Sequence, residues 1–233
     1  MIRNIIFSIL FFLGIIIISL IFLPAFFLPK KIVLIGGKLM GYWTGFCLKV
    51  FLSTKITIKG KENMITNERF FIAASHQSMF ETFYLQTIFN SPIFILKKEL
   101  LRIPIFGWYL KKIGSVSINR NKISKDNLGL IDKIKNSVKI SQRPLIIFPQ
   151  GTRVLPNEIV PFKKGVGRIY DELKIKCQPV AINSGNVWPK NGKLTSKQTI
   201  IISILPAIKP GMSSVDFTSH IEDKIYNELK LMN

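Results

Sequence analysis

The sequence predicts an α/β fold with a mostly parallel central sheet flanked by helices, preceded by an N-terminal membrane-associated helical hairpin. Three observations support this prediction. Two long apolar stretches occupy the first 53 residues. Beyond Thr54, short runs rich in β-branched and aromatic residues alternate with runs of helical periodicity. Strands that alternate with helices in this way favour parallel pairing.

The first apolar stretch extends from Asn4 to Pro29 without a charged residue, and Arg3 precedes it. As a helix, about 24 residues measure roughly 36 Å, whereas the hydrocarbon core of a bilayer is about 30 Å thick. A tilted spanning helix therefore fits, and so does a helix that lies in one leaflet. A cleaved signal peptide is disfavoured, because the run is long and no clear small-x-small cleavage site follows it.

The second stretch, residues 32–53, is interrupted by Lys38, Lys49 and four glycines. Its Tyr42 and Trp43 suit the bilayer interface. We therefore expect an interfacial helix that packs beside the first one, with a broken second span as the alternative. The lysines that follow the first stretch outnumber the positive charges before it. If the first helix spans, the positive-inside rule places the rest of the chain in the cytoplasm.

These patterns predict two parts, with residues 1–54 as membrane-anchoring helices and residues 55–233 as an α/β domain. We expect the protein at the inner membrane, with this domain facing the cytoplasm. Apolar residues at helical spacing predict helices around 128–138 and 217–229, and a third helix is expected at 79–89. Seven strands are expected, at 56–60, 69–75, 92–97, 115–119, 144–149, 178–183 and 199–205.

The charge balance points to an anionic partner. The chain has 33 Lys and Arg against 13 Asp and Glu, a formal net charge of +20. Such an excess favours phospholipid headgroups or an acidic carrier, although a solvated lysine-rich surface explains part of it. Nucleic acid is not expected, because no basic stripe is interleaved with stacking aromatics. Cys47 and Cys177 show neither metal-ligand spacing nor a disulfide framework, so we expect no metal site and a reducing cytoplasmic setting.

His76 stands where the apolar run FFIAAS ends, and Glu81 follows five residues later. Ligands bind at the carboxyl ends of strands in open α/β sheets. On one interpretation, Ser78 and Glu81 form a capping box at the start of the next helix. On the other, Glu81 accepts a hydrogen bond from one ring nitrogen of His76 and leaves the other free to take a proton. Residues five apart do not share a helix face, so the second interpretation requires His76 to precede the helix.

Together with His76 and Glu81, three later stretches resemble, in order and spacing, the sequence blocks of the glycerolipid acyltransferase family. They are GSVSINR (114–120), FPQGTR (148–153) and QPVAINSG (178–185). The resemblance covers roughly residues 55–205 and is greatest to the 1-acyl-sn-glycerol-3-phosphate acyltransferases. KKELLRIPIFGWYL (97–110) also resembles the linking segment of that family.

The resemblance implies an enzyme that moves a fatty acyl group from an acyl thioester to the sn-2 hydroxyl of 1-acyl-sn-glycerol 3-phosphate, giving phosphatidate. His76 would be the general base and Glu81 its partner. The implied partners are the lysophospholipid, the bilayer, and acyl-CoA or acyl carrier protein as co-substrate, with no cofactor. Glu81 stands where the family usually has Asp, which keeps the charge. Gln150 stands where Glu is usual, which removes one.

The phosphate of the acceptor calls for cationic and N–H donor groups. A guanidinium matches phosphate oxygens in a bidentate way, and backbone N–H groups of a turn can form a small anion site. The substrate-binding residues implied by the resemblance are Arg120, Gln150, Gly151, Thr152 and Arg153. Lys97 is a further candidate for the phosphate, with a solvated surface lysine as the alternative.

Two other functions remain open at this point. One is a related acyltransferase that acts on another lysolipid, such as a lyso-ornithine lipid, and needs fewer phosphate contacts. The other is a non-catalytic basic membrane-binding protein, which would not depend on His76.

Overall fold

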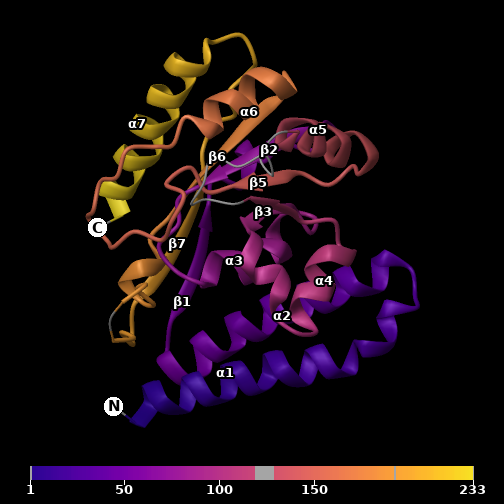
Figure 1. Ribbon diagram of the computed structural model, residues 1–233. Coiled ribbons are helices and arrows are strands. Elements are labelled where there is room, and N and C mark those ends of the chain that lie inside the picture. The colour runs from indigo at the N-terminus through magenta and orange to yellow at the C-terminus, as the bar shows by residue number, and fades with distance from the viewer. Residues whose placement is uncertain (1, 119–128, 192, 233) are drawn as a thin grey trace.

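Across residues 2–118, 129–191 and 193–232, which the computed structural model describes, seven strands form one sheet (Figure 1). Their order across the sheet is β1-β7-β6-β2-β5-β3-β4. Each predicted strand agrees with an observed one to within two residues at either end. The strands are β1 (Lys55–Lys59), β2 (Phe70–Ala74), β3 (Ile93–Lys97), β4 (Val116–Ile118), β5 (Leu145–Ile147), β6 (Lys176–Ile182) and β7 (Thr199–Ile204).

Every neighbouring pair of strands is parallel except β6 and β7. The predicted mostly parallel sheet is therefore confirmed. The described part of the β6–β7 connection contains one short 3-10 helix, η5 (Ser184–Asn186), in place of a crossover α-helix. Two successive parallel strands need a long crossover that carries the chain back to the edge where the first strand began. Here β7 starts at the edge where β6 ends, so a shorter connection joins them as an antiparallel pair.

Helices cover both faces of the sheet, which lies between them as a middle layer (Figure 1). Alternate side chains of β2 show how the layers are built: Ile72 and Ala74 pack toward one set of helices, whereas Phe71 and Ala73 pack toward the other. The first set is α1 (Ile2–Ile21), α2 (Lys30–Leu52), α3 (Phe80–Ile88) and α4 (Phe106–Lys112); the second is α5 (Leu130–Ile140), α6 (Gly165–Leu173) and α7 (Ser214–Met232).

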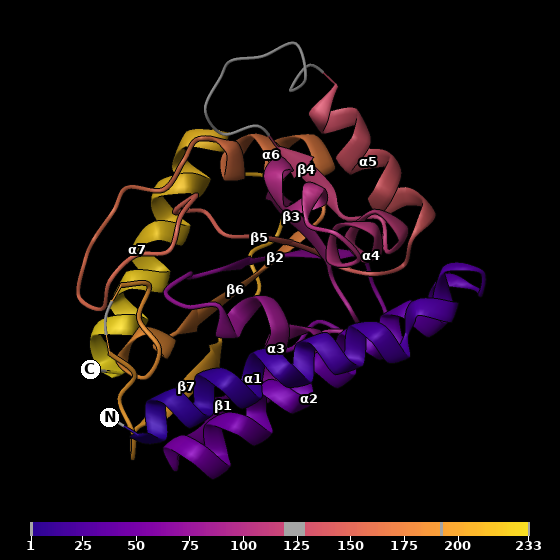
Figure 2. The same cartoon turned by 60° about the horizontal axis from the view of Figure 1, so that its bottom comes forward.

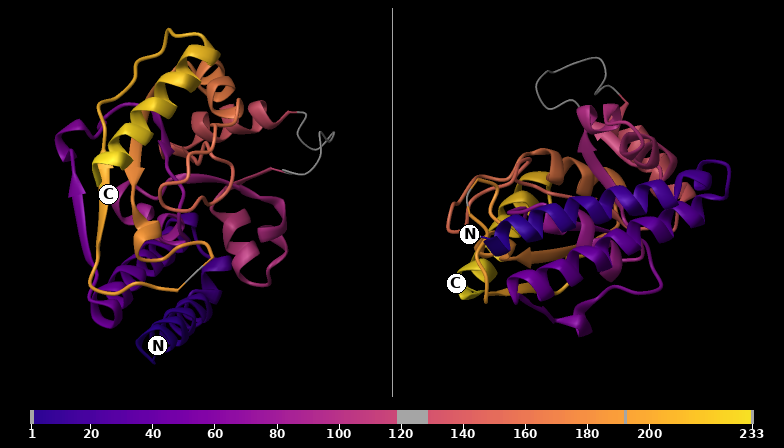
Figure 3. Two further views of the ribbon diagram at one scale, coloured as in Figure 1. Left: turned by 90° about the vertical axis from the view of Figure 1, so that its left-hand side faces the viewer. Right: turned by 90° about the horizontal axis from the view of Figure 1, so that it is seen from below.

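Helices α1 and α2 lie side by side along one face of the molecule (Figures 2 and 3). The expected helix at residues 32–53 is thus present and packs beside the first. Phe7 and Phe11 of α1 are buried in the same apolar cluster as Ile72 of the sheet and Phe83 of α3. The two helices therefore share a core with the α/β part of the chain.

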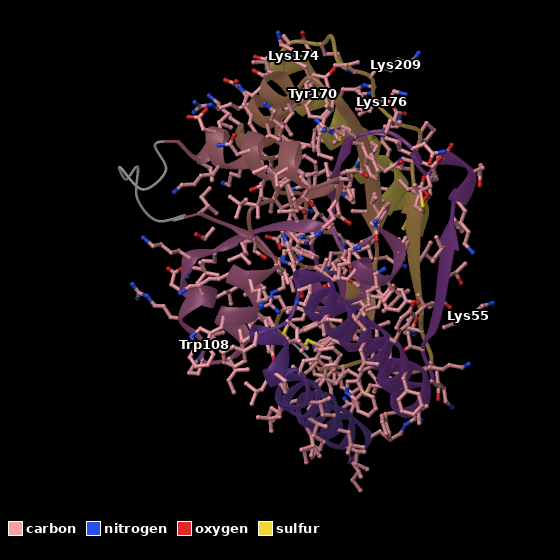
Figure 4. All side chains as sticks on the ribbon, turned by 90° about the vertical axis from the view of Figure 1, so that its right-hand side faces the viewer. Lys55, Trp108, Tyr170, Lys174, Lys176 and Lys209 are labelled. Carbon is pink, nitrogen blue, oxygen red and sulfur yellow. The ribbon has the colours of Figure 1, made fainter. Side chains whose placement is uncertain are left out.

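The outer side of α1 and α2 remains apolar and exposed. Within the described residues, α1 is the one helix whose length and composition would allow it to cross a membrane. Trp108 lies close to this side in Figure 4, whereas Lys174, Lys176 and Lys209 lie at the opposite end of the molecule. The exposed apolar residues of the two helices include Ile5, Ile9, Phe12, Ile16, Ile35, Leu39, Tyr42, Phe46 and Val50.

Helix α6 was not expected from the sequence. Two glycines, Gly165 and Gly167, weaken the helical signal at its start. Gly167 has a packing role, because a Cβ atom there would lie 2.1 Å from the carbonyl oxygen of Ser214 at the start of α7. The close approach of α6 and α7, which only the folded chain reveals, therefore explains this residue.

Candidate active site

The carboxyl ends of the parallel strands meet at one edge of the sheet, and the predicted site residues follow them. His76 comes two residues after β2, Lys97 ends β3, and Phe148 comes directly after β5. Asn183 comes directly after β6. The sheet order thus brings together segments that are far apart in the chain. Arg120, expected beyond β4, lies outside the described residues.

The His76 side chain is held in a defined position. Its ring stacks on Phe148, with centroids 4.1 Å apart and planes inclined by 17°. Its backbone N–H donates to Oε1 of Gln150 at 2.9 Å, and its carbonyl accepts the N–H of Val154 at 2.9 Å. The side chain is 12% exposed, so the ring is mostly buried while part of it still reaches solvent.

Glu81 is fully buried, and its Oε2 lies 3.5 Å from Nδ1 of His76. That distance is longer than a formed hydrogen bond, and Nδ1 has no hydrogen-bond partner among the described residues. Such hydrogen bonds are often long in ligand-free active sites and shorten when substrate binds. Nδ1 is thus the ring nitrogen that faces the carboxylate, which leaves Nε2 for a substrate.

The Glu81 carboxylate is surrounded by donors. Its oxygens accept the backbone N–H groups of Gln77, at 3.1 Å, and Ser78, at 3.1 and 3.2 Å. The hydroxyl of Ser184 also donates to Oε1. The side chain of Ser78 also bonds the start of the helix, because its Oγ accepts the N–H of Phe80 at 3.0 Å. Glu81 therefore takes part in a capping arrangement before α3 and also faces His76, whereas its hydrogen bond to the histidine ring stays a prediction.

The turn after β5 divides the predicted substrate-binding residues into two groups. Gln150 is fully buried, so its side chain does not reach solvent. It contacts the backbone of His76 from the protein interior. Gly151 adopts a φ of 73°, a left-handed conformation that glycine tolerates best. Thr152 is exposed, and its Oγ1 accepts a hydrogen bond from Nζ of Lys190 at 3.3 Å.

Two of the predicted phosphate ligands are accessible cations. Arg153 is half-buried and forms no ion pair or hydrogen bond with any residue that the structure describes. Nζ of Lys97 lies 3.4 Å from Oε1 of Glu99, and both side chains are 45% exposed. An exposed pair of this kind is weak, so Lys97 can exchange its partner for a ligand anion.

The loop after Arg153 is tied to α7. The hydroxyl of Tyr226 donates to the carbonyl of Val160 at 2.7 Å and accepts its N–H at 3.0 Å. Burial raises the pKa of Tyr226, so this hydroxyl stays protonated. Glu222 also accepts the N–H of Phe162 at 2.7 Å. These contacts hold the far end of the loop that carries Arg153.

Sequence reasoning missed three residues of the site. Ser184 bonds Glu81, Lys190 bonds Thr152, and Oε1 of Gln77 accepts the N–H of Gly185 at 3.0 Å. Ser184 lies in the short polar run that follows β6, and a polar residue just past a strand end was the available signal. Lys190 had no signal of this kind, because it is one of many surface lysines.

Comparison with known proteins adds the decisive observation: the acyltransferase family model matches residues 55–183, more than half of the chain. This chain belongs to the acyltransferase family. The matched region of this acyltransferase includes β1 to β6, His76, Glu81 and the turn at 150–153.

Two curated relatives are named 1-acyl-sn-glycerol-3-phosphate acyltransferase. The one from Pseudomonas aeruginosa is 31% identical over 71% of this chain and 65% of its own length. The one from Helicobacter pylori is 33% identical over 67% of this chain and 67% of its own length. This acyltransferase thus spans about two thirds of the length of these relatives.

A solved structure shows the same fold. It is titled as the 1-acyl-sn-glycerophosphate (LPA) acyltransferase PlsC from Thermotoga maritima, and it matches with a TM-score of 0.80 at 23% identity. The match covers 99% of this chain and 96% of that one. Helices α1 and α2 therefore lie within the shared fold.

Gln150 tests the support beneath His76. We expect Gln150→Met to reduce the free energy of unfolding by about 1–3 kcal/mol, because the buried N–H of His76 loses its acceptor. We also expect turnover per folded protein to fall. Gln178→Met is the matched control, since Gln178 is equally buried and accepts the N–H of Ile65, not of His76, at 3.0 Å. Urea unfolding and acyl-transfer rates would measure both effects; equal turnover in the two variants would contradict a positioning role for Gln150.

Proposed function

We propose that this acyltransferase transfers a fatty acyl group from an acyl thioester to the sn-2 hydroxyl of 1-acyl-sn-glycerol 3-phosphate, forming phosphatidate. The observation that carries the proposal is a fully buried carboxylate, Glu81, facing Nδ1 of His76 at the ligand-binding edge of the sheet. The names of the curated relatives support the choice of acceptor.

The reaction needs one proton to move twice. Nε2 of His76 takes the proton of the sn-2 hydroxyl while that oxygen attacks the thioester carbonyl carbon. The C–O ester bond forms, the C–S bond breaks, and the imidazolium returns the proton to the departing sulfur. The products are phosphatidate and a free thiol. A positioned general base contributes about 10²- to 10⁴-fold to such a step.

No covalent acyl-enzyme is required, because the thioester is already an activated donor. Cys177 is an unsuitable nucleophile, since complete burial raises the pKa of its thiol well above the usual value and leaves it neutral. Direct attack by the acceptor hydroxyl therefore accounts for the chemistry with His76 alone as base.

Glu81 acts on His76 in two ways. It accepts a hydrogen bond from Nδ1–H once substrate is bound, which selects the tautomer with Nε2 free, and it balances the imidazolium charge that develops during attack. The donors from Gln77, Ser78 and Ser184 keep the carboxylate in place for both tasks. We assign Gln150 to positioning rather than to substrate contact, because it is buried beneath His76.

The acceptor phosphate is proposed to bind the accessible cations beside the site. The guanidinium of Arg153 forms no hydrogen bond or ion pair with any described residue, and Arg153 follows directly after Thr152 on the β5 turn. Lys97 lies at the same sheet edge, and Lys190 adds a third positive group. Arg120 remains part of this proposal on the sequence resemblance alone.

The proposed acyl donor is acyl-CoA or acyl carrier protein, and either is an anionic molecule that a chain of charge +20 would attract.

We further propose that α1 and α2 lie in one leaflet of the bilayer. The start of α1 is held by Arg3, which donates to the carbonyl of Phe51 and to Oγ of Ser53. Near its other end, the carbonyl of Ser19 accepts the hydroxyl of Tyr109 at 2.6 Å. If α1 crossed the membrane, the α/β body packed along it would have to enter the hydrocarbon. On this proposal only the exposed apolar side enters the lipid, and the site lies near the headgroups.

The proposed base and its partner are tested by Glu81→Gln. We expect turnover to fall by about 10²-fold or more, because an amide neither fixes the Nδ1 tautomer nor balances the imidazolium. His76→Ala should lose as much. Glu172→Gln is the control, since Glu172 pairs with Lys135 on the far side of the sheet. Phosphatidate formation from lysophosphatidate and acyl thioester is the measurement. Near-normal turnover in the Glu81 variant would leave Glu81 with its capping role only.

The proposed phosphate site is tested by Arg153→Ala. We expect the acceptor KM to rise at least about tenfold, because a charged hydrogen bond to phosphate contributes about 1.5–3 kcal/mol. A lysolipid without phosphate should be used equally well by the variant and the parent protein. Arg168→Ala, at an exposed arginine of α6, is the control. A loss of the same size for both lysolipids would exclude phosphate recognition by Arg153.

The proposed membrane face is tested by placing a charge on it. Phe46→Glu, on the outer side of α2, should strongly reduce cosedimentation with phospholipid vesicles. Val215→Glu replaces an equally apolar residue that is 75% exposed on α7 and should leave vesicle binding unchanged. Equal binding of the two variants would show that α2 does not face the lipid.

A further inference from the structure

The loop between β6 and β7 connects the active-site edge with the α1–α2 hairpin and runs past the start of α1 (Figure 3). Its Trp188 packs edge-on against two aromatic rings of α1, at centroid distances of 5.2 Å to Phe7 and 4.9 Å to Phe11. Both phenylalanines are buried, and Phe11 also packs against Phe83 of α3 at 5.6 Å. Trp188 is therefore seated in an aromatic cluster built mainly by the hairpin.

Trp188 is also joined to the active site through one tight turn. Its backbone N–H donates to the carbonyl of Ser184 at 2.8 Å, and the N–H of Val187 donates to the same carbonyl at 3.1 Å. Val187 and Ser184 are fully buried, so this turn has little freedom to move. The hydroxyl of Ser184 then donates to the Glu81 carboxylate. The two hydrogen bonds to the Ser184 carbonyl therefore link the position of Trp188 to that of Ser184 within a turn of five residues.

Further contacts attach the same loop to both helices of the hairpin. The carbonyl of Leu194 accepts the side-chain amide of Asn4 at 2.8 Å, and the N–H of Lys197 donates to the carbonyl of Leu52 at 2.7 Å. At the other end, the N–H of Gly185 donates to Oε1 of Gln77, whose own N–H bonds Glu81. The loop is consequently fixed by the hairpin on one side and by the donors of Glu81 on the other.

We propose that Trp188 is a positioning residue for acyl transfer. Packed edge-on against Phe7 and Phe11, it fixes the turn at 184–188, and Ser184 in turn fixes the Glu81 carboxylate against His76. The membrane-facing hairpin is therefore also a support of the catalytic pair. The expected effect on turnover rests on the proposed function, whereas the expected effect on the tautomer of His76 does not. Because a misplacement of about 1 Å can cost about 10²-fold in rate, a modest shift of Ser184 is enough to matter.

The kinetic test uses the full chain in detergent micelles. Trp188→Ala should reduce kcat about tenfold and change the KM for lysophosphatidate by much less, because Arg153 and Lys97 lie on other segments of the chain. Trp188→Phe, which keeps an aromatic ring in the cluster, should restore most of the rate. Trp108→Ala is the matched control: it removes a tryptophan that is 52% exposed and packs on Phe26, away from this loop.

A double-mutant cycle decides whether Trp188 acts through Ser184. Ser184→Ala alone should also reduce kcat, and adding Trp188→Ala to it should cost less than about twofold more, since the link is already broken. Independent multiplication of the two losses would overturn the proposal. If Trp188→Ala lowers the folded fraction, Phe11→Leu loosens the same contact from the α1 side and enters the cycle in its place.

A readout without turnover separates this inference from the proposed function. The chain has two histidines, so ¹⁵N spectra of labelled imidazoles report on His76 once His220→Gln removes the other signal. In the parent protein, we expect the tautomer with the proton on Nδ1. Trp188→Ala should shift the ring toward a mixture of tautomers, whereas Trp108→Ala should not. An unchanged His76 spectrum in Trp188→Ala would refute the coupling even if acyl transfer were slowed. A shifted spectrum in a protein that forms no phosphatidate would refute the proposed acceptor and keep the coupling.

Discussion

A carboxylate shielded from water has to be surrounded by hydrogen-bond donors, and Glu81 imposes this requirement on the whole site. The donors come from the backbone of Gln77 and Ser78, between β2 and α3, and from the hydroxyl of Ser184 beyond β6. None of these segments can shift without leaving a buried charge poorly solvated. The need to supply hydrogen-bond donors to one buried side chain therefore sets the position of two pieces of chain around His76, and the proposed general base takes its orientation from them.

The parallel sheet makes this arrangement possible. Because β2, β5 and β6 are neighbours with their carboxyl ends at one edge, residues near 76, 150 and 184 meet without long loops. The hairpin is part of the same construction, since Phe7 and Phe11 share a core with the sheet. For an enzyme whose proposed acceptor and product both reside in a bilayer, a site supported by lipid-facing helices has a physical advantage. The surface proposed to meet the lipid and the groups proposed to carry out the chemistry belong to one packed unit.

Gln150 departs from the family pattern but still makes a specific contact in the folded chain. Judged as a charge, its replacement of the usual Glu would weaken any pairing with an arginine. In the folded chain its oxygen accepts the N–H of His76, a task that an amide oxygen performs as well as a carboxylate. An amide also avoids placing a second negative charge in a buried region that already contains Glu81. The substitution is thus consistent with a functional site, for a reason that the identity of the residue alone does not reveal.

The sequence by itself determined the seven strands in order, three of the helices around them, the two apolar N-terminal helices, and the placement of His76 and Glu81 around a strand end. These follow from local periodicity and from residues only a few positions apart. Only the tertiary structure decided that Ser184 bonds Glu81 across 103 positions and that Gln150 supports His76 across 74. It also decided that β7 runs antiparallel to β6 and that Trp188 packs against α1. The physical reason is that such contacts depend on which strands become neighbours, and hydrophobic periodicity contains no information about that choice.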